Sequence, residues 1–246
     1  MNDIPARLAA AGIDLPRPGP LPLAEGVTAA GFPSAGDDAL DWWRRLRAVH
    51  DTTGLWPVLI PSLDDAVCPS GRFGPDPAGR VAVALTRDGA ALLNRGRPLA
   101  EEPERVREEL LEQWPEDPYR IDRFYLPYEW DGQPRQVLVA LIEAQHGWQV
   151  LPLLDYGYWN DCPEPAVHGA VLRHWGERWG AELVCMARDG IELALTRPPR
   201  TRETALELAW EYPVYCLDGM SLYYADGVSD LAACLIDADL VRFWWD

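Results

Sequence analysis

One cysteine and two histidines have the residue types and the placement for nucleophilic catalysis. Cys162 lies just before a predicted helix, and a thiol near a helix N-terminus has a lowered pKa. His168 and His174, on that helix, are the candidate bases. His168 is six residues beyond Cys162 and on another helix face, so we expect poor geometry for a direct contact between the two side chains.

The loop before this helix, Trp159–Glu164, also has a complete structural interpretation. Asp161 can cap the helix while Glu164 reaches back to the backbone, as in a capping box. Trp159 then packs into the core, and the amide of Asn160 stabilises the turn. If the loop lines a binding site instead, Trp159, Asn160 and Asp161 are its binding residues.

A cluster of arginines, residues 197–202, precedes a second predicted helix. The free N–H groups of a helix N-terminus favour anions, so Arg197 and Arg200 are candidate binding residues for a phosphate or a carboxylate. The alternative is a rigid, proline-containing connector whose arginines pair with acidic residues of the surface. Both interpretations fit the sequence.

The carboxylates and histidines of the predicted helices give weaker indications of a catalytic or metal site. Glu203, Glu207 and Glu211 repeat every four residues, which predicts one solvated helix face. Glu192 is a separate candidate on a predicted strand, and His168 shares a helical stripe with bulky apolar residues that indicates the edge of the core. No metal-ligating residues have a local spacing typical of a metal site, so we expect neither a metal nor a cofactor.

The charged residues exclude several classes of function. All 22 basic residues are arginine, which rules out a lysine Schiff base, a pyridoxal-phosphate anchor and a P-loop lysine. The net charge of −17 is the opposite of what nucleic-acid binding requires. It indicates first a solvated acidic surface that keeps the chain soluble, and its functional interpretation is a protein partner with a basic surface. The five cysteines, an odd number without a C-x-x-C pair, predict neither a disulfide framework nor a zinc knuckle.

The hydropathy of the chain predicts a cytoplasmic location. The first residues lack a basic start followed by an apolar run, so they do not resemble a secretion signal. The longest strongly apolar run, Val137–Ile142, has six residues, far short of the roughly 20 that cross a bilayer. We therefore expect no association with the membrane.

Proline content and periodicity divide the chain into three regions. Residues 1–36 are proline-rich and predicted to be loosely structured apart from a short helix, residues 37–130 form an N-terminal α/β region, and residues 131–246 form the C-terminal domain. Pro57 indicates an edge or irregular position for its strand. In the N-terminal region we expect helices at 37–50 and 103–114 and strands at 55–60 and 80–86.

The C-terminal domain is predicted to be a mixed, largely antiparallel sheet flanked by helices, an α/β (α+β) fold that carries an N-terminal α/β extension. Asp189-Gly190 indicates a hairpin turn, and Thr201 and Ser229 are predicted to cap helices. The expected strands are 135–144, 148–154, 181–187, 191–196 and 240–245, and the expected helices are 163–179, 201–212 and 229–236.

Several segments together resemble one bacterial family. They are Gly157–Pro163, Trp175–Val184, Ile191–Leu193, Arg197–Pro199, Tyr215–Asp218 and Phe243–Asp246. In combination they resemble domain-of-unknown-function family 4253 over roughly residues 150–246, and Trp43–Leu59 is similar to the N-terminal part of longer members. The resemblance implies a compact α/β domain without an established activity, and an association of some members with bacterial toxin–immunity gene neighbourhoods.

Two hypotheses about function follow. The leading one is a non-catalytic protein-binding module of a bacterial cytoplasmic protein, immunity-like in role, whose partner is a basic protein such as a toxin. The alternative is an enzyme, or a small-ligand or anion-binding domain, with a site around Cys162, His168 and Arg197. Convergence of Asn160, Cys162, His168 and Arg197 on one cleft would favour the alternative, and their separation would favour the binding module.

Overall fold

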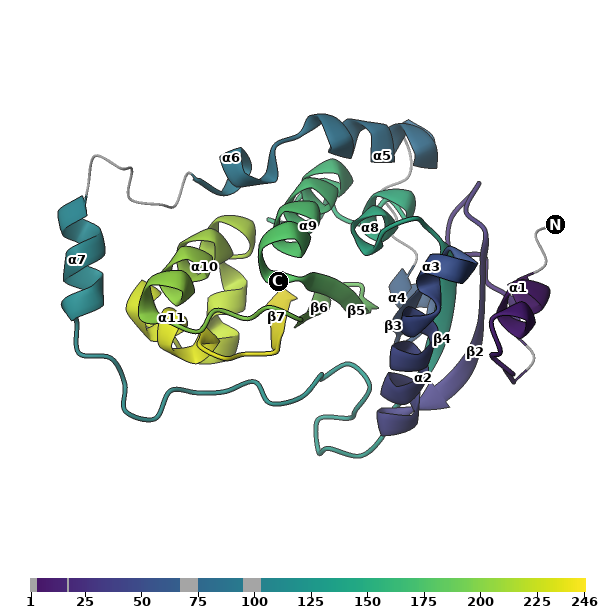
Figure 1. The fold of residues 1–246 in the computed structure, drawn as a ribbon, viewed down its shortest axis with the longest axis horizontal. Helices are drawn as coiled ribbons and strands as arrows, with labels where there is room; N and C mark the ends of the chain where they lie inside the picture. The colour runs from purple at the N-terminus through teal and green to yellow at the C-terminus, as the bar shows by residue number, and fades with distance from the viewer. Residues whose placement is uncertain (1–3, 17, 67–74, 95–102) are drawn as a thin grey trace.

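A seven-stranded sheet runs through the molecule (Figure 1). The structure is a computed structural model that describes residues 4–16, 18–66, 75–94 and 103–246. The strand order is β1-β2-β4-β3-β5-β6-β7; β3 and β5 are parallel and the other neighbouring pairs are antiparallel. The predicted mixed, largely antiparallel α/β fold is therefore confirmed. The strands are β1 Gly19–Pro20, β2 Ala29–Ala35, β3 Leu55–Ile60, β4 Gln136–Glu143, β5 Ala181–Ala187, β6 Gly190–Leu195 and β7 Leu240–Trp244.

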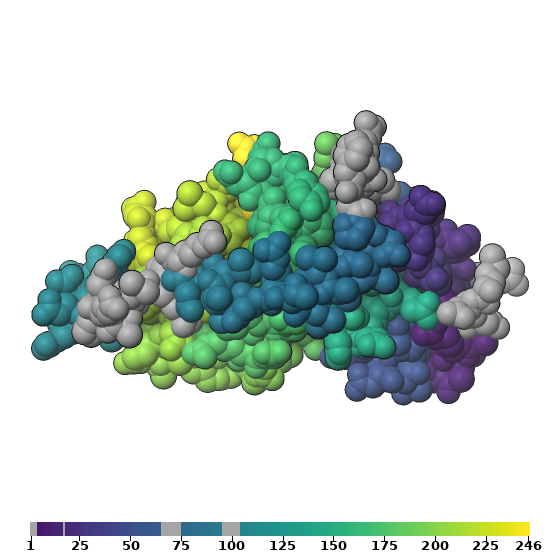
Figure 2. All heavy atoms as spheres, turned by 90° about the horizontal axis from the view of Figure 1, so that it is seen from above, coloured from purple at the N-terminus to yellow at the C-terminus, as the bar shows by residue number. Residues whose placement is uncertain are grey.

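Helices pack against the sheet in two hydrophobic cores. The smaller core joins α1 and α2 to β2, β3 and β4, and the larger one joins α8, α9, α10 and α11 to β5, β6 and β7. Figure 2 shows α5 and α6 as a band across α9, which both contact. Within the described ranges, no helix is long and apolar enough to cross a membrane. The helices are α1 Ile4–Ala10, α2 Gly36–Ala48, α3 His50–Thr53, α4 Leu63–Ala66, α5 Pro77–Thr86, α6 Gly89–Leu93, α7 Pro103–Leu111, α8 Val150–Leu153, α9 Pro165–Trp179, α10 Arg202–Tyr215 and α11 Val228–Leu235, with 3-10 turns η2 Gly147–Gln149 and η3 Asp218–Tyr223.

The N-terminal region and the C-terminal domain share this sheet, because β4 lies between β2 and β3. Its pairing with β2 runs from Gln136 opposite Ala35 to Ile142 opposite Ala29. On its other edge β4 pairs with all six residues of β3. Both strands that pair with β4 therefore come from the N-terminal region.

The first 36 residues contain the strand β2, so the expectation of a loosely structured segment was wrong for residues 29–35. Gly31 and Pro33 weaken the strand pattern in the sequence. Gly31 is suited to its position because it lies against β4, where a Cβ would fall 2.7 Å from the Val139 carbonyl oxygen. Pro33 lies beyond the two residue pairs that β1 makes, so its missing N–H interrupts no ladder on that side.

The edge position expected for the strand with Pro57 was also wrong. β3 lies in the middle of the sheet and all its residues are buried. Pro57 is tolerated there because the parallel pairing with β5 consists of one registered pair, Leu59 with Cys185. The Pro57 carbonyl accepts a hydrogen bond from the indole of Trp43 at 2.9 Å, which ties α2 to the sheet.

Two segments predicted as strands are helical. Residues 80–86 belong to α5, where Asp76 caps the helix by accepting a hydrogen bond from the Gly79 N–H at 2.7 Å. Residues 148–154 form η2 and α8, and Gln149 closes the preceding turn by accepting bonds from two backbone N–H groups. Short apolar runs do not distinguish a buried strand from a buried helix, because neither period is visible in them.

Side chains close the open edge of β7. Tyr223 accepts a hydrogen bond from the Arg242 N–H at 3.3 Å, and Tyr212 donates its hydroxyl to the Arg242 carbonyl. The thiol of Cys216 donates to the Trp244 carbonyl at 3.0 Å. These bonds occupy backbone groups that would otherwise invite another strand to pair.

The substitution Gly147→Ala tests the contact between η2 and β3. A Cβ at this position would lie 2.3 Å from the ring of Trp56, which a 3.1 Å hydrogen bond to the Leu183 carbonyl holds in place. We expect a loss of about 1–3 kcal/mol in the free energy of unfolding, measured by urea denaturation. Gly19→Ala is the control, because nothing lies within 4 Å of that Cβ. Equal effects of the two substitutions would contradict the proposed contact.

Candidate functional site

The loop before α9 has an unusual backbone. Asp155, Gly157, Tyr158 and Asn160 have positive φ angles of 57°, 127°, 71° and 44°. Three of these residues are not glycine, and such conformations persist only where the surroundings enforce them. At Gly157 a Cβ would lie 2.0 Å from the Pro163 carbonyl oxygen, so this position requires glycine. The strain marks the loop as a candidate site.

Two buried side chains anchor this loop. Tyr156 is fully buried and packs edge-on against Trp159 at 4.9 Å and His168 at 5.2 Å between ring centroids. Asp155 is also buried, and its carboxylate lies 3.4 Å from the Nε of Arg80 in α5. The loop is therefore fixed to both α9 and α5.

Asp161 does not cap α9, so the predicted capping box was wrong. The helix begins at Pro165, and its N-cap residue is Glu164, whose side chain makes no capping hydrogen bond. The Glu164 carboxylate pairs instead with Arg87 at 2.9 Å, and Asp161 is exposed. The physical reason is that Cys162 belongs to the returning loop and not to the first helical turn.

This return of the loop brings Cys162 and His168 together, contrary to our expectation of poor geometry. The Cys162 Sγ lies 3.4 Å from the His168 Nε2, and the His168 Nδ1 lies 2.6 Å from the Tyr215 hydroxyl. The expectation was wrong because it counted the six residues from Cys162 to His168 along a helix, whereas the chain from Cys162 to Glu164 is a loop and α9 begins at Pro165. A cysteine, an imidazole and a phenol thus form a continuous contact.

Burial limits what this contact can do chemically. His168 is fully buried among the rings of Tyr156, Tyr215 and Trp245, and burial lowers its pKa to about 3, while a hydrogen bond to the Pro163 carbonyl acts in the opposite direction. A neutral imidazole with so low a pKa is a poor proton acceptor at neutral pH. Burial likewise raises the pKa of Tyr215. These groups are arranged as a neutral network.

A cavity of about 460 Å³ lies where this loop meets the end of the chain. Trp159, Asn160 and Trp245 line it, together with Arg188 and residues beside them. The amide of Asn160 donates a hydrogen bond to the main-chain carbonyl of Asp246. Two of the predicted binding residues, Trp159 and Asn160, therefore lie at one cavity, whereas Asp161 is not among its lining residues.

The arginines of the connector lie elsewhere. Arg197 donates hydrogen bonds to the carbonyls of Gly176 and Glu177, at the C-terminal end of α9, at 2.8 and 2.6 Å. His168 lies near the start of the same helix, so about two helical turns separate the two sites. Arg200 forms an exposed ion pair with Asp237 at 3.1 Å. The structure thus brings Cys162 and His168 together but does not bring Arg197 to them.

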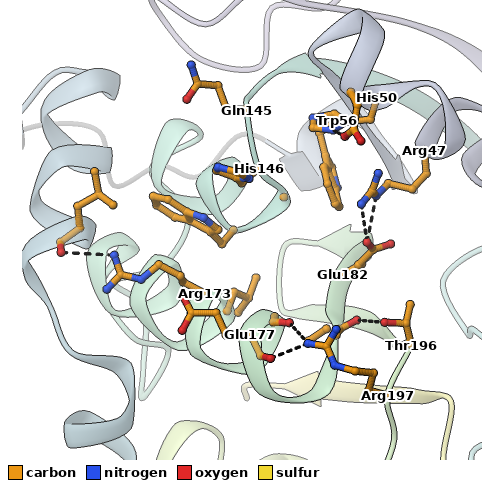
Figure 3. A pocket seen from close by; sticks show the side chains of 18 residues that line it. Arg47, His50, Trp56, Gln145, His146, Arg173, Glu177, Glu182, Thr196 and Arg197 are labelled. Carbon is orange, nitrogen blue, oxygen red and sulfur yellow. Dashed lines mark hydrogen bonds and ion pairs between the residues drawn. The ribbon is translucent and has the colours of Figure 1, made fainter.

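Arg197 lines a larger cavity of about 540 Å³, between the N-terminal region and the C-terminal domain (Figure 3). Its walls come from α2, β3, η2, β5 and the end of α9. Figure 3 shows Trp56 and His146 on opposite sides of the opening, with the Arg47–Glu182 ion pair at one edge. This cavity was not predicted, because its residues come together only through the shared sheet.

Two of the candidate carboxylates are buried. Glu211 was expected on a solvated face, but its carboxylate is buried and accepts hydrogen bonds from the Trp175 indole at 2.8 Å and the His174 imidazole at 3.2 Å. The expectation was wrong because α10 packs between α9 and α11 and has no continuous solvent face. Glu207 pairs with Arg178, and Glu203 is exposed.

Glu192 is fully buried in β6 and anchors the segment 112–135, which runs past the sheet in Figure 1. Its carboxylate accepts the backbone N–H groups of Tyr125 at 2.6 Å and Leu126 at 3.0 Å. Burial raises the pKa of Glu192, and these two hydrogen bonds oppose the rise. Among the described residues, no group of three or more His, Cys, Asp or Glu side chains could hold a metal ion.

Comparison with known proteins identifies the C-terminal part of the chain. Residues 138–246, the C-terminal part of the chain, match the model of the family described as Domain of unknown function (DUF4253). The match begins within β4, twelve residues before the start expected from the sequence motifs. No curated protein and no solved structure matches the chain.

The low pKa of His168 predicts a loss of stability in mild acid. The unfolded chain, with a histidine pKa near 6.5, takes up a proton that the folded protein excludes down to about pH 3. Stability is therefore fully present above pH 6.5 and falls below it by about 1.4 kcal/mol per pH unit. The substitution His168→Gln is expected to reduce this slope, measured as the free energy of unfolding between about pH 7 and pH 5. His146→Gln, at an exposed imidazole, should keep it; an unchanged slope in His168→Gln would contradict the assignment.

Proposed function

We propose that this chain, whose residues 138–246 carry the DUF4253 domain, is a non-catalytic protein-binding module whose partner presents a basic surface. The observation that carries the proposal is an exposed pair of tyrosines in acidic surroundings. Tyr119 and Tyr224 are 47% and 79% exposed, and their rings meet edge-on with centroids 5.0 Å apart. Tyrosine pairs of this kind are typical of interface centres, because each ring offers a large contact area and a polar hydroxyl.

The surroundings of this pair are strongly acidic. The 24 residues from 216 to 239 contain five aspartates and no basic residue. Arg120 lies beside Tyr119, but its guanidinium donates hydrogen bonds to the main-chain carbonyls of Cys234 and Ile236. The surface therefore presents negative charge around exposed rings, which suits a partner rich in arginine or lysine.

We define the acidic–aromatic surface as Tyr119, Tyr224, Asp226, Leu217 and Asp218. The last two residues stand at the start of η3, and Tyr224 follows its end. Leu217 is 67% exposed and adds apolar area to this surface, which a partner could cover. Tyr224 has a φ of 52°, a conformation that turns the chain at the end of η3.

If the module has an immunity-like role, the partner that binds this surface is a basic toxin made in the same cell. The net charge of −17 would speed the encounter with such a partner by long-range attraction. Binding of this kind needs no catalytic group, which agrees with the neutral state of the buried His168. The proposal rests on the surface and on the resemblance described above.

Removal of the two tyrosine rings tests the proposal. The chain is co-expressed with the product of the neighbouring gene, and complex formation is measured by calorimetry and by protection of the cells. We expect a 1:1 complex, at least about 30-fold weaker in the double variant Tyr119→Ala/Tyr224→Ala, because buried aromatic anchors contribute about 2 kcal/mol or more. Trp130→Ala is the matched control, an 86% exposed ring outside this surface. Absence of a complex and of protection would overturn the proposal.

A thiol-dependent enzyme is the second candidate, because the structure places Cys162 beside His168. Only 5% of Cys162 is exposed, so a reagent reaches the thiol only when the loop opens. We therefore expect Cys162 to react with a disulfide reagent more slowly than free cysteine, as measured by mass-spectrometric mapping of labelled peptides. The Cys162→Ala variant identifies the corresponding peptide. Labelling faster than free cysteine would favour the enzyme over the binding module.

A further inference from the structure

The cavity in Figure 3 has the size and position of a small-molecule site. Its volume of about 540 Å³ lies within the range of about 300–1,000 Å³ that is typical of ligand pockets. It lies between two parts of the chain, where such pockets occur preferentially. Neither the acidic–aromatic surface nor the loop around Cys162 contributes to its lining.

Flat side chains form the walls of this cavity. On one side the rings of His146 and Trp148 stack nearly in parallel, with an interplanar angle of 14° and centroids 6.2 Å apart. On the other side the planar guanidinium of Arg47 lies over the ring of the buried Trp56, at 4.6 Å from the ring centroid. Flat walls on both sides favour a flat ligand, since such a ligand can contact both at once.

One charged side chain of the cavity, Arg173, suits an anion. Arg47 is neutralised by Glu182, to which it donates two hydrogen bonds at 3.1 and 2.6 Å. Arg173 stands over the Trp148 ring at 5.8 Å and donates only to main-chain carbonyls, those of Leu85 and Arg87. Within the described part of the chain, Arg173 has no carboxylate partner, so its charge remains uncompensated.

A second guanidinium stands at the rim. Among the residues that the structure describes, Arg197 donates to main-chain carbonyls alone, through one of its two terminal nitrogens, which leaves its other donors for a ligand. Two carboxylates, those of Asp51 and Glu177, line the cavity as well, but both are exposed and water screens their charge. The half-buried Arg173 is therefore the charge that a ligand in the cavity would meet.

We propose that this cavity binds a flat aromatic compound that carries one anionic group, with its ring between the His146–Trp148 stack and the Arg47 guanidinium and its anion on Arg173. Guanidinium groups form paired hydrogen bonds with carboxylates and with phosphates alike, so an aryl carboxylate and a nucleoside monophosphate share this chemistry. Because both parts of the chain supply the walls, a bound ligand would also hold them together and raise the thermal stability.

Calorimetric titration with two matched pairs of probes tests this site. The pairs are 2-naphthoate with 2-naphthamide, and adenosine monophosphate with adenosine. We expect one anionic probe to bind with a Kd of about 1 mM or lower and to raise the melting temperature, while its neutral analogue binds at least about tenfold more weakly. The pair that binds distinguishes a carboxylate from a phosphate ligand.

Variants connect the binding to the named side chains. Arg173→Gln and Trp148→Ala are each expected to weaken the binding of that probe at least tenfold, and Arg173→Lys to weaken it less than Arg173→Gln. Arg200→Gln, at an exposed arginine paired with Asp237, should leave it unchanged. An unchanged unfolding midpoint in Arg173→Gln separates lost binding from lost folding. The proposal is overturned if neither anionic probe shows saturable binding. It is also overturned if the neutral analogue binds as tightly as the anion, or if Arg173→Gln leaves the affinity unchanged.

Discussion

The pairing of β4 on both of its edges is the constraint on which the rest of the structure depends. All but the first two residues of β4 lie in the matched region 138–246, yet the strands it pairs with, β2 and β3, both precede that region. The strands β5, β6 and β7 join the sheet through β3, where Leu59 stands opposite Cys185. The N-terminal region therefore supplies the central strand of the sheet, β3, and is an integral part of the fold. The cavity in Figure 3 exists only because of this arrangement.

Many side chains that could do chemistry serve instead as internal hydrogen-bond partners. Glu192 holds the segment 112–135 by two backbone N–H groups, Glu211 joins α10 to α9, and Cys216 closes the edge of β7. His168 is enclosed by aromatic rings and stays neutral. Buried polar groups of this kind specify one arrangement of the core, because each must find its own partner. A partner or a ligand can therefore reach only side chains on the surface and in the cavities.

The accessible features differ in charge, and this difference separates two kinds of recognition. The acidic–aromatic surface around Tyr119 and Tyr224 presents exposed rings among aspartates, which suits a basic protein partner. The cavity at Arg173 is concave, and among the described residues this arginine has no carboxylate partner, which suits a small anion. The two features can therefore act independently.

The sequence by itself determined the elements whose signals are local. The hairpin across Asp189-Gly190, the helix capped by Thr201 and the long helix that ends at Trp179 all follow from turn residues, caps and periodicity. Only the tertiary structure decided how these elements combine: that β2 joins the sheet and that the loop before α9 folds back to set Cys162 beside His168. The physical reason is that burial and contact depend on neighbours far apart in sequence, and no local pattern records which faces will meet.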